Sequence, residues 1–562
     1  MTDAPSPPTG TPLAGRRHAG RVLAFSMFIM GACGLVYEYT LAALGNNLLG
    51  SRHEQIFVVI GVMMFAMGVG SVVQKQIGGH LVDKWLLFEV LLGLAGGLST
   101  CLIYAAFAYT TSHQLAMYSC AFSIGVLIGM EIPLLIRINE QYSESLRANL
   151  SQVLFMDYVG SLVGALLFAY VLLTRLTLIN ISLCLGMVNT LLALLGVVYF
   201  WPLVRWRRRL VAAIVLTATV LGFGLALSGT IVATLEQRCF ADPIVLSETT
   251  RYQHLVLTRR DDDVSLYIDG DLQFSSDDEA IYHEFLVHAP MSVAHSRRRV
   301  LILGGGDGLA LREVLKYDDV EEVVLVDIDR RITELAREEP DLVALNRGSL
   351  LDARVSTFVG EGSSPGELRE IRRSARSPQD LLGGEDDALA QVRVLNVDAD
   401  LFLRRVSGEF DVVVIDFPDP KSIAVAKLYS VDFFRQLAVR LGPQGILSIQ
   451  ASSPVRAREV FLCVGATLRA AGFSARPYHH NVPSFGEWGW YLAQPNERRE
   501  TEVNQKIDAL ERITVHTEFL TAALLRGSFA FGKRWLLADN IRPNTKMRPR
   551  LVEYARRAWQ PN

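Results

Sequence analysis

Apolar residues are distributed very unevenly along this chain of 562 residues. Between residues 22 and 235 they form seven long, almost uncharged runs, each with about 20 residues, enough to cross the hydrocarbon core of a bilayer. These runs lack the polar face of a helix that packs on a soluble core. The pattern predicts a multi-span α-helical membrane domain over 22–235, behind a tail at 1–21, with a lipid bilayer as its partner. The expected spans lie near 22–45, 55–75, 85–110, 114–136, 152–174, 177–200 and 210–235.

Lysine and arginine in the short loops predict the orientation of these spans, because cytoplasmic loops carry an excess of both. Eleven of them fall on the side that includes the amino terminus, and only Arg52 and Arg175 fall on the other. We therefore expect the tail at 1–21 in the cytoplasm, below a cell (inner) membrane. Seven spans would place the rest of the chain on the opposite side, and a re-entrant or miscounted span would reverse that result.

Four carboxyl groups interrupt the apolar runs, namely those of Glu38, Glu89, Glu131 and Asp157. Ionisable side chains at membrane depth are costly and usually mark a functional site. A path for a cation or polyamine would explain them, and so would hydrogen-bonded carboxyl groups that fix contacts between helices. Small-residue motifs at 68–70 and 160–164 favour close helix packing. The sequence leaves both explanations open.

From residue 236 onward the chain has the composition of a soluble protein. Between 244 and 274 apolar and polar residues alternate in three segments separated by polar turns. This alternation predicts three strands of a small antiparallel β-domain, which we place at 236–295. A helix with an apolar face is expected next, around 281–289.

Short apolar strands then alternate with helical segments. This alternation predicts an α/β Rossmann-like (methyltransferase-type) domain at 296–495, doubly wound around a parallel sheet, with its site at the carboxyl ends of the strands. The segment 360–391 is rich in glycine, serine, proline and charge and is expected to be an insertion, and 496–562 is expected to be a helical tail that packs on this domain. The expected strands are 300–303, 320–329, 392–397, 410–416 and 445–450.

The strand at 300–303 runs into a GGGDG sequence at 304–308 and then into an amphipathic helix. Glycines such as Gly304 and Gly306 let the backbone turn tightly and approach a ligand, and the start of a helix adds a positive pole. Asp327, about 20 positions further on at the tip of the next strand, suits a ribose diol. With Asp307, this arrangement predicts a nucleoside-type site.

A second acidic signal ends the strand at 410–416, in the sequence VIDFPDP. Asp416 ends the strand, and Asp419 follows in a turn restrained by prolines. Turn chemistry alone would explain Asp-x-Pro-Asp-Pro. Beside a nucleoside-type pocket, however, two carboxylates suit a cationic substrate, because one can hold an amine while the other accepts a proton.

Composition excludes several other functions. The formal net charge of −3 leaves no basic footprint, so we expect no nucleic-acid partner. The six cysteines show no CxxC spacing, and no His/Cys/Asp cluster is visible along the sequence. We therefore expect neither a metal site nor a disulfide framework.

Seven segments resemble the polyamine aminopropyltransferases (spermidine synthases), in that family's order along residues 245–495. They are YQHLVLT, LYIDGDLQ, DEAIYHEFLVH, VLILGGGDGLALREVLK, VDID, NVDA and DFPDP. The whole chain is similar to the membrane-fused bacterial branch. The resemblance implies an enzyme of spermidine biosynthesis that transfers the aminopropyl group of decarboxylated S-adenosylmethionine to a diamine, putrescine, and releases methylthioadenosine. It further implies a homodimer and no permanently bound cofactor.

The resemblance also implies a role for each matching residue. Asp416 would accept the proton, Tyr282 and Asp419 would bind the amine, and Asp327 would bind the ribose hydroxyls. The backbone carbonyl of Asp398 and Ala399 would face the adenine. The sulfonium nucleoside as a whole would be held by Gln253, His283, Gly304, Gly306, Asp307, Asp327, Asp398 and Ala399.

Two places depart from the family pattern. Where the family reads DxxDPxGPA, this chain has KSIA at 421–424, which places Ile423 in the motif, and Phe485 stands where a tyrosine is usual. The preferred diamine therefore stays open. Trp488 and Trp490 would either wall the pocket or pack in the core.

Two alternative functions also stay open. One is an S-adenosylmethionine-dependent methyltransferase, which shares the glycine loop and the ribose acid. Asp416 and Asp419 argue against it, because a methyl acceptor has no general need of paired carboxylates. The other is a polyamine transporter or sensor, which the carboxyl groups of the membrane domain suggest. The sequence does not determine the role of that domain, the membrane side of the catalytic domain or the oligomeric state.

Overall fold

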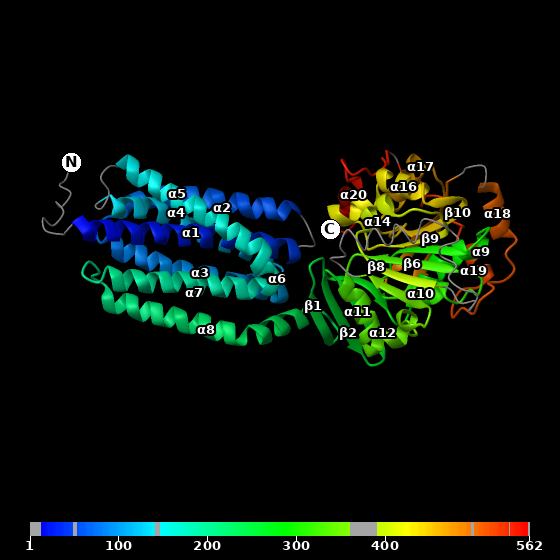
Figure 1. Cartoon of the computed structure of the whole chain (residues 1–562), viewed down its shortest axis with the longest axis horizontal. Helices are drawn as coiled ribbons and strands as arrows, with labels where there is room; N and C mark the ends of the chain where they lie inside the picture. The colour runs from blue at the N-terminus through cyan, green and yellow to red at the C-terminus, as the bar shows by residue number, and fades with distance from the viewer. Residues whose placement is uncertain are drawn as a thin grey trace. The chain divides into compact units, whose positions relative to one another are not determined.

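The computed structural model describes residues 13–48, 53–140, 146–359, 391–495, 500–538 and 540–559. Contacts between residues divide the chain into two compact units, Met1–Pro243 and Ile244–Asn562. The first unit is all helical and the second mixes helices with two sheets (Figure 1), which confirms the predicted fold class. Residues 1–12 of the expected tail and 360–390 of the expected insertion lie outside the described residues.

The first unit is a bundle of long helices. Seven helical segments in the described part of the chain are apolar and long enough to cross a membrane, as predicted. The fifth of them continues from α5 through a π-helical turn at Phe168–Leu172 into the short α6 (Leu173–Arg175). The long helices are α1 (Leu13–Leu48), α2 (His53–Val73), α3 (Leu81–Tyr109), α4 (His113–Asn139), α5 (Leu146–Leu167), α7 (Leu178–Tyr199) and α8 (Arg207–Gln237).

Glycines allow the helices of the bundle to touch backbone to backbone. A Cβ atom on Gly160 of α5 would lie 2.0 Å from the carbonyl oxygen of Phe28 in α1. One on Gly70 of α2 would lie 2.2 Å from the carbonyl oxygen of Val126 in α4. These contacts exclude any larger residue and are typical of membrane helices, which associate through small residues.

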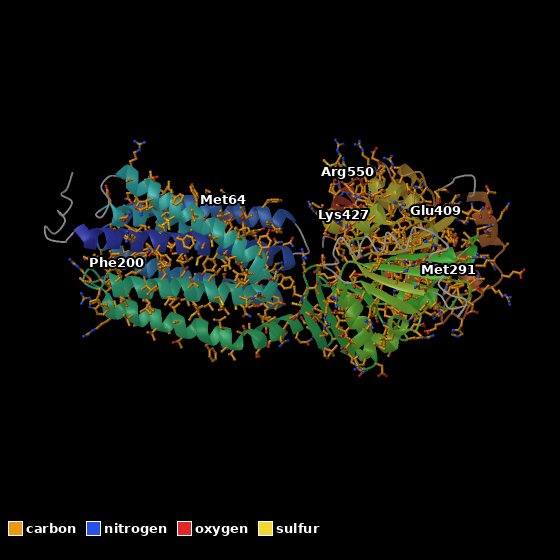
Figure 2. The ribbon with its side chains drawn as sticks, in the orientation of Figure 1. Met64, Phe200, Met291, Glu409, Lys427 and Arg550 are labelled. Atoms are coloured by element: carbon orange, nitrogen blue, oxygen red, sulfur yellow. The ribbon has the colours of Figure 1, made fainter. Side chains whose placement is uncertain are left out.

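The outer surface of the bundle is apolar. Phe57, Met64 and Phe65 of α2 are 71%, 64% and 68% exposed, and Met64 is labelled in Figure 2. A soluble protein rarely exposes so many large apolar side chains together. Apolar faces of this kind suit contact with lipid.

The second unit begins with a four-stranded antiparallel sheet in the order β1-β2-β3-β4. The expectation of three strands is wrong, because the third segment folds back on itself at Asp269-Gly270. Both residues have positive φ, +52° and +84°, as the tightest hairpin turns require. The strands are β1 (Ile244–Thr249), β2 (His254–Arg260), β3 (Asp263–Ile268) and β4 (Asp271–Ser275).

The larger sheet has eight strands in the order β11-β12-β10-β9-β5-β6-β8-β7. Strands β5 to β10 are parallel as predicted, whereas β12 is antiparallel to both of its neighbours and makes the sheet mixed. Its strands are β5 (Arg299–Gly304), β6 (Glu322–Asp327), β7 (Val355–Val359), β8 (Gln391–Asn396), β9 (Phe410–Asp416), β10 (Leu441–Gln450), β11 (Ser474–Val482) and β12 (Gly486–Gln494).

Helices cover both faces of this sheet, so alternate residues of each central strand enter different cores. In β5, Leu301 and Leu303 pack with α14, α16 and α17, whereas Val300 and Ile302 pack with α9 and α10. Fully buried strands of this kind position loops firmly at their ends. The helices are α9 (Glu279–Val293), α10 (Leu309–Val314), α11 (Arg330–Glu338), α12 (Pro340–Leu345), α14 (Ala399–Arg405), α15 (Ile423–Ala426), α16 (Val431–Ala438) and α17 (Arg458–Ala470).

The carboxy-terminal segment packs on the second unit through α18 (Glu500–Asp508), α19 (Ala522–Gly527) and α20 (Arg550–Trp559). The tail that we expected to be helical over 496–562 is helical only in part, because residues 510–521 form no helix. Instead, Glu284 of α9 accepts hydrogen bonds from the backbone N–H groups of residues 518–520. These bonds use donors that a helix would need for itself.

Candidate active site

The carboxyl ends of β5 and β9 meet in the middle of the larger sheet, and the candidate site forms around them. The strand order reverses here, because the chain leaves β5 for β6 on one side while β9 lies on the other. Open α/β sheets usually bind ligands at such a point. Gly304 lies in register with Asp416, and a Cβ on Gly304 would lie 2.0 Å from the Asp416 carbonyl oxygen. With its φ of +84° as well, this position requires glycine.

Gly306 brings the backbone against Asp327 at the end of β6. The Gly306 N–H donates to Asp327 Oδ2 at 3.0 Å, and the Asp329 N–H donates to Oδ1 at 2.8 Å. Burial raises the pKa of Asp327 to about 7, although both backbone hydrogen bonds oppose the shift. In either protonation state this carboxyl group can hydrogen-bond to a hydroxyl group.

Asp307 lies in the same loop, just before α10. Its Oδ1 accepts the Leu309 N–H at 2.9 Å. Burial raises the pKa of Asp307 to about 6; the positive charge of His283 opposes this rise, and the negative charge of Asp416 adds to it. The loop therefore places the Asp307 carboxyl group where it feels the negative charge of Asp416.

Helix α9 brings Tyr282 and His283 to the end of β9. The Tyr282 hydroxyl donates to Asp416 Oδ1 at 2.7 Å, and His283 Nε2 lies 3.7 Å from Asp416 Oδ2. Burial raises the pKa of Asp416, whereas the charge of His283 and the hydrogen bond from Tyr282 lower it. The Asp416 side chain keeps 11% of its surface exposed, so a ligand can still reach it.

Behind His283 lies a buried chain of ion pairs. His283 Nδ1 lies 2.8 Å from Glu279 Oε2, and Arg312 Nη1 donates to Glu279 Oε1 at 2.7 Å. Burial alone would lower the pKa of His283, but the hydrogen bond and charge of Glu279, together with Asp416 and Asp307, raise it to about 9. His283 is therefore positively charged at neutral pH and reduces the repulsion between the carboxylates around it.

Asp419 lies in the turn after β9 and is only partly satisfied. Ser452 Oγ donates to Asp419 Oδ2 at 3.1 Å, while Asp419 Oδ1 is buried without a hydrogen-bond partner in the part of the chain that the structure describes. Burial raises the pKa of Asp419, and the charge of Lys421 opposes this. A buried oxygen without a donor is costly, so an ammonium group bound there would be favoured.

Two buried side chains hold this turn in place. Gln450 Nε2 donates to the carbonyl oxygen of Phe417 at 2.7 Å and to the Tyr429 hydroxyl at 2.7 Å. The Tyr429 hydroxyl in turn donates to the carbonyl oxygen of Pro418 at 3.3 Å. Both carboxylates of the DFPDP segment are thus attached to a fixed backbone.

Asp398 and Ala399 lie at the end of β8, where α14 begins. Asp398 Oδ1 accepts the Asp400 N–H at 2.8 Å as the helix cap, and Asp398 Oδ2 lies 2.5 Å from Nζ of Lys427, which is labelled in Figure 2. Burial would raise the pKa of Asp398, but the hydrogen bond and charge of Lys427 lower it below its ordinary value. Both carboxylate oxygens of Asp398 thus have partners within the protein.

Gln253 lies half-buried in the turn between β1 and β2. Thr250 in the same turn donates to Asp329 Oδ2 at 2.7 Å. This hydrogen bond brings the turn to the end of β6, where Asp327 lies. The small sheet thus contributes to the same region as the glycine loop.

Aromatic side chains surround Tyr282. The ring of Phe485 lies 6.0 Å from that of Tyr282 and 4.9 Å from that of Trp488. Trp490 is completely buried and stacks on Phe285 at 5.6 Å, although it also lies 5.7 Å from Tyr282. Trp490 is therefore mainly a core residue, and Phe485 contacts the rings of both Tyr282 and Trp488.

The fold also brings together a group that the linear sequence does not reveal. Ligand atoms of His283, Asp307 and Asp416 all lie within 4.8 Å of one another, as do those of Glu284, His288 and Glu313. The expectation that the chain has no metal site stays a prediction. In the first group, the hydrogen bond and charge of Glu279 favour the protonated form of His283, and a protonated imidazole cannot ligate a metal.

Sequence analysis missed Glu279, Arg312 and Ser452. Glu279 could have been found, since it lies four residues before His283 on a predicted helix. Ser452 follows β10, which pairs with β9, so its position at the strand end was also a usable signal. Arg312 gave no local signal because it lies on another helix.

Comparison with known proteins identifies the family. A sequence profile described as "Spermine/spermidine synthase domain" matches residues 279–364 and 383–506. Polyamine aminopropyltransferase 1 of Streptomyces coelicolor is 38% identical over 99% of this chain and 97% of its own length. The chain belongs to the spermine/spermidine synthase family.

A second relative and a solved structure are also similar to this chain. Polyamine aminopropyltransferase 1 of Ralstonia nicotianae is 36% identical over 99% of both chains. A crystal structure of spermidine synthase from Thermotoga maritima matches 52% of this chain and 87% of that one, at 22% identity and a TM-score of 0.39. This member of the synthase family is thus an enzyme of polyamine biosynthesis that transfers aminopropyl groups, as the resemblance implied.

The Glu279–Arg312 pair leads to a prediction about pH dependence. Replacing Glu279 by Gln removes the main group that keeps His283 protonated, and a neutral His283 no longer lowers the pKa of Asp416. We expect the acid limb of the kcat/KM profile for aminopropyl transfer to move to higher pH by about 1 unit, the size that a lost neighbouring charge commonly produces.

The matched control is Glu313→Gln, which removes another partner of Arg312 but none of His283. It should leave the acid limb in place even where it lowers stability. A Glu279→Gln enzyme that loses activity equally at every pH would show that the pair only supports the fold.

Proposed function

We propose that this enzyme transfers the aminopropyl group of decarboxylated S-adenosylmethionine to putrescine and forms spermidine and methylthioadenosine. The observation that carries the proposal is the position of Asp416, which contacts Tyr282 and lies in register with the glycine loop. A carboxylate that can accept a proton therefore lies beside a loop suited to a nucleoside. Acceptor amine and donor carbon would meet between them.

The chemistry needs alignment and a free amine. The attacking nitrogen of putrescine forms a bond to the aminopropyl carbon while the bond from that carbon to sulfur breaks, and the sulfur leaves as a neutral thioether. The nitrogen loses one proton, which Asp416 accepts. Because a sulfonium is already a good leaving group, the main contribution of the protein is to hold both partners in line.

The donor would lie along the ends of β5, β6 and β8. Asp327 would bind the ribose hydroxyls, the backbone of Asp398 and Ala399 would face the adenine, and Asp307 would lie near the cationic end. Supporting groups are the glycines of the loop and the nearby turn between β1 and β2. The full donor set is Gln253, His283, Gly304, Gly306, Asp307, Asp327, Asp398 and Ala399.

The acceptor would extend from Asp416 toward Asp419. Tyr282 would orient the attacking amine, and the unpartnered Asp419 Oδ1 would hold the distal ammonium. A charged hydrogen bond there contributes more than a neutral one. Phe485 lacks the hydroxyl group that the family pattern supplies, so length selection would rest on Asp419 and the aromatic wall.

A substitution at Asp416 tests the proton acceptor. Asp416→Asn should lower kcat by a factor of about 10² or more, because loss of a general base typically costs that much. Asp411→Asn is the matched control, since Asp411 lies at the other end of β9 and bonds to Ser296 and Arg299. Near-normal turnover by the Asp416 variant would contradict the assignment.

The identity of the donor is tested by the nucleoside product. With decarboxylated S-adenosylmethionine and putrescine, we expect methylthioadenosine and spermidine in equal amounts, measured by chromatography and mass spectrometry. With S-adenosylmethionine we expect no turnover. Formation of S-adenosylhomocysteine would instead indicate a methyltransferase.

We further propose that the enzyme is a homodimer anchored by its seven apolar helices in the cell membrane. The loop charges favour a cytoplasmic amino terminus, and seven spans then place the carboxy terminus outside. A carboxy-terminal alkaline phosphatase fusion should be active and a fluorescent-protein fusion dark. The reverse result would show that one apolar helix does not cross the membrane and that the donor meets the enzyme in the cytoplasm.

A further inference from the structure

The core of the helical unit contains polar side chains that the candidate active site does not use. Tyr37 of α1, Glu89 of α3, Glu131 of α4 and Asn189 of α7 are at most 1% exposed. Each has a buried oxygen or nitrogen with no hydrogen-bond partner among the described residues. Such atoms are costly inside an apolar bundle unless a ligand satisfies them.

Glu89 is satisfied on one side only. Trp85, one helical turn earlier, donates its Nε1–H to Glu89 Oε1 at 3.1 Å, and Glu89 Oε2 has no partner within the described segments. The Trp85 ring is completely buried next to this carboxyl group. An acid and an indole thus lie together, and both groups attract organic cations.

The Tyr37 hydroxyl points into this region from α1. A Cβ on Gly96 would lie 2.8 Å from the Tyr37 hydroxyl oxygen, and Gly96 follows Glu89 by two turns on the same face of α3. The hydroxyl group interacts electrostatically with Glu89 and Glu131. It is therefore a fully buried polar group that packs against α3 and has no hydrogen-bond partner among the described residues.

The acids act on one another without a compensating cation. Glu131 interacts electrostatically with Glu89 and Asp157. Asp157 of α5 reaches α1, because a Cβ on Gly31 would lie 2.8 Å from Asp157 Oδ1. Within the described residues, no lysine or arginine acts on these three carboxyl groups.

Asn189 lies at the same depth on α7. A Cβ on Gly186 would lie 2.4 Å from the Gly93 carbonyl oxygen, and one on Gly196 would lie 3.3 Å from the Trp85 ring. These two contacts join residues 93 and 85 of α3 to residues 186 and 196 of α7. Glu89 lies between the first two positions, and Asn189 lies between the second two. Both the oxygen and the nitrogen of the Asn189 amide are without partners in the described part of the chain.

We propose that Tyr37, Trp85, Glu89, Glu131 and Asn189 form a binding site for an aliphatic ammonium ion inside the helical unit. The carboxyl groups of Glu89 and Glu131 supply the opposite charge by releasing a proton when the cation binds, and the hydroxyl and amide oxygens can accept hydrogen bonds from the ammonium N–H groups. The two aromatic rings favour the same ligand class through cation–π attraction. An alkali metal ion would instead prefer a shell made only of oxygen atoms, and the indole of Trp85 interrupts such a shell.

Equilibrium binding of radiolabelled putrescine and spermidine to the full-length protein in nanodiscs tests the site. Binding is measured in a double variant, Asp416→Asn with Asp419→Asn, which lacks the acceptor site proposed above for the other unit and serves as the background. We expect one saturable site per chain to remain, and we expect Glu131→Gln or Glu89→Gln to weaken it at least tenfold. Glu140→Gln, an exposed acid just after α4, is the matched control and should bind as the background does.

Tyr37→Phe guards against misfolding, since it removes only a hydroxyl group and should weaken binding severalfold while the elution volume stays unchanged and the melting temperature without ligand does not fall. Absence of saturable binding in the background would overturn the proposal, and so would binding that survives both glutamine substitutions. Equal displacement by Na⁺ or K⁺ would overturn the ammonium assignment. Transfer activity of the unmodified enzyme is measured separately, so failure of either proposal can be recognised alone.

Discussion

Four largely buried carboxyl groups gather at the carboxyl ends of the central strands, and the surrounding structure serves to hold them there. Burial raises the pKa of Asp307, Asp327, Asp416 and Asp419, because water no longer stabilises their charges. Fixed donors offset part of this cost, namely backbone N–H groups at Asp327 and the imidazolium of His283 beside Asp416. A cation bound beside these groups would offset more of it, which agrees with the proposed amine and sulfonium substrates.

The two units treat buried acids differently. In the second unit, Glu279 lies between His283 and Arg312, which are both bonded to it, so its charge is matched inside the protein. In the helical unit, Glu89 has only the indole of Trp85, which is a neutral donor. An acid that is paired with a cation inside the protein stabilises and positions its neighbours. An acid without such a cation can still bind a cationic ligand, and this contrast supports the ligand site proposed for the helical unit.

Sequence patterns located the strand ends well, and the candidate site lies at strand ends. Asp416 and Asp327 were predictable because each follows a continuous apolar strand, whose period and length are local properties. The hairpin at 269–270 was missed although Asp-Gly is a strong turn signal, because the apolar alternation runs on across it. The non-helical segment at 518–520 was not predictable, since Glu284, more than 200 residues away in the chain, determines its backbone hydrogen bonds.

Lys421 lies two residues after Asp419, just before Ser422 and Ile423, where this chain departs from the family pattern. The Lys421 ammonium lies 2.6 Å from Asp271 Oδ1 at the start of β4 and 4.8 Å from the centre of the Trp559 ring. The charge of Lys421 opposes the rise in the pKa of Asp419 that burial produces. The ammonium group pairs with Asp271 and Trp559, and Asp419 Oδ1 has no partner among the described residues. The lysine thus moderates the charge of Asp419 through space without a hydrogen bond to its Oδ1.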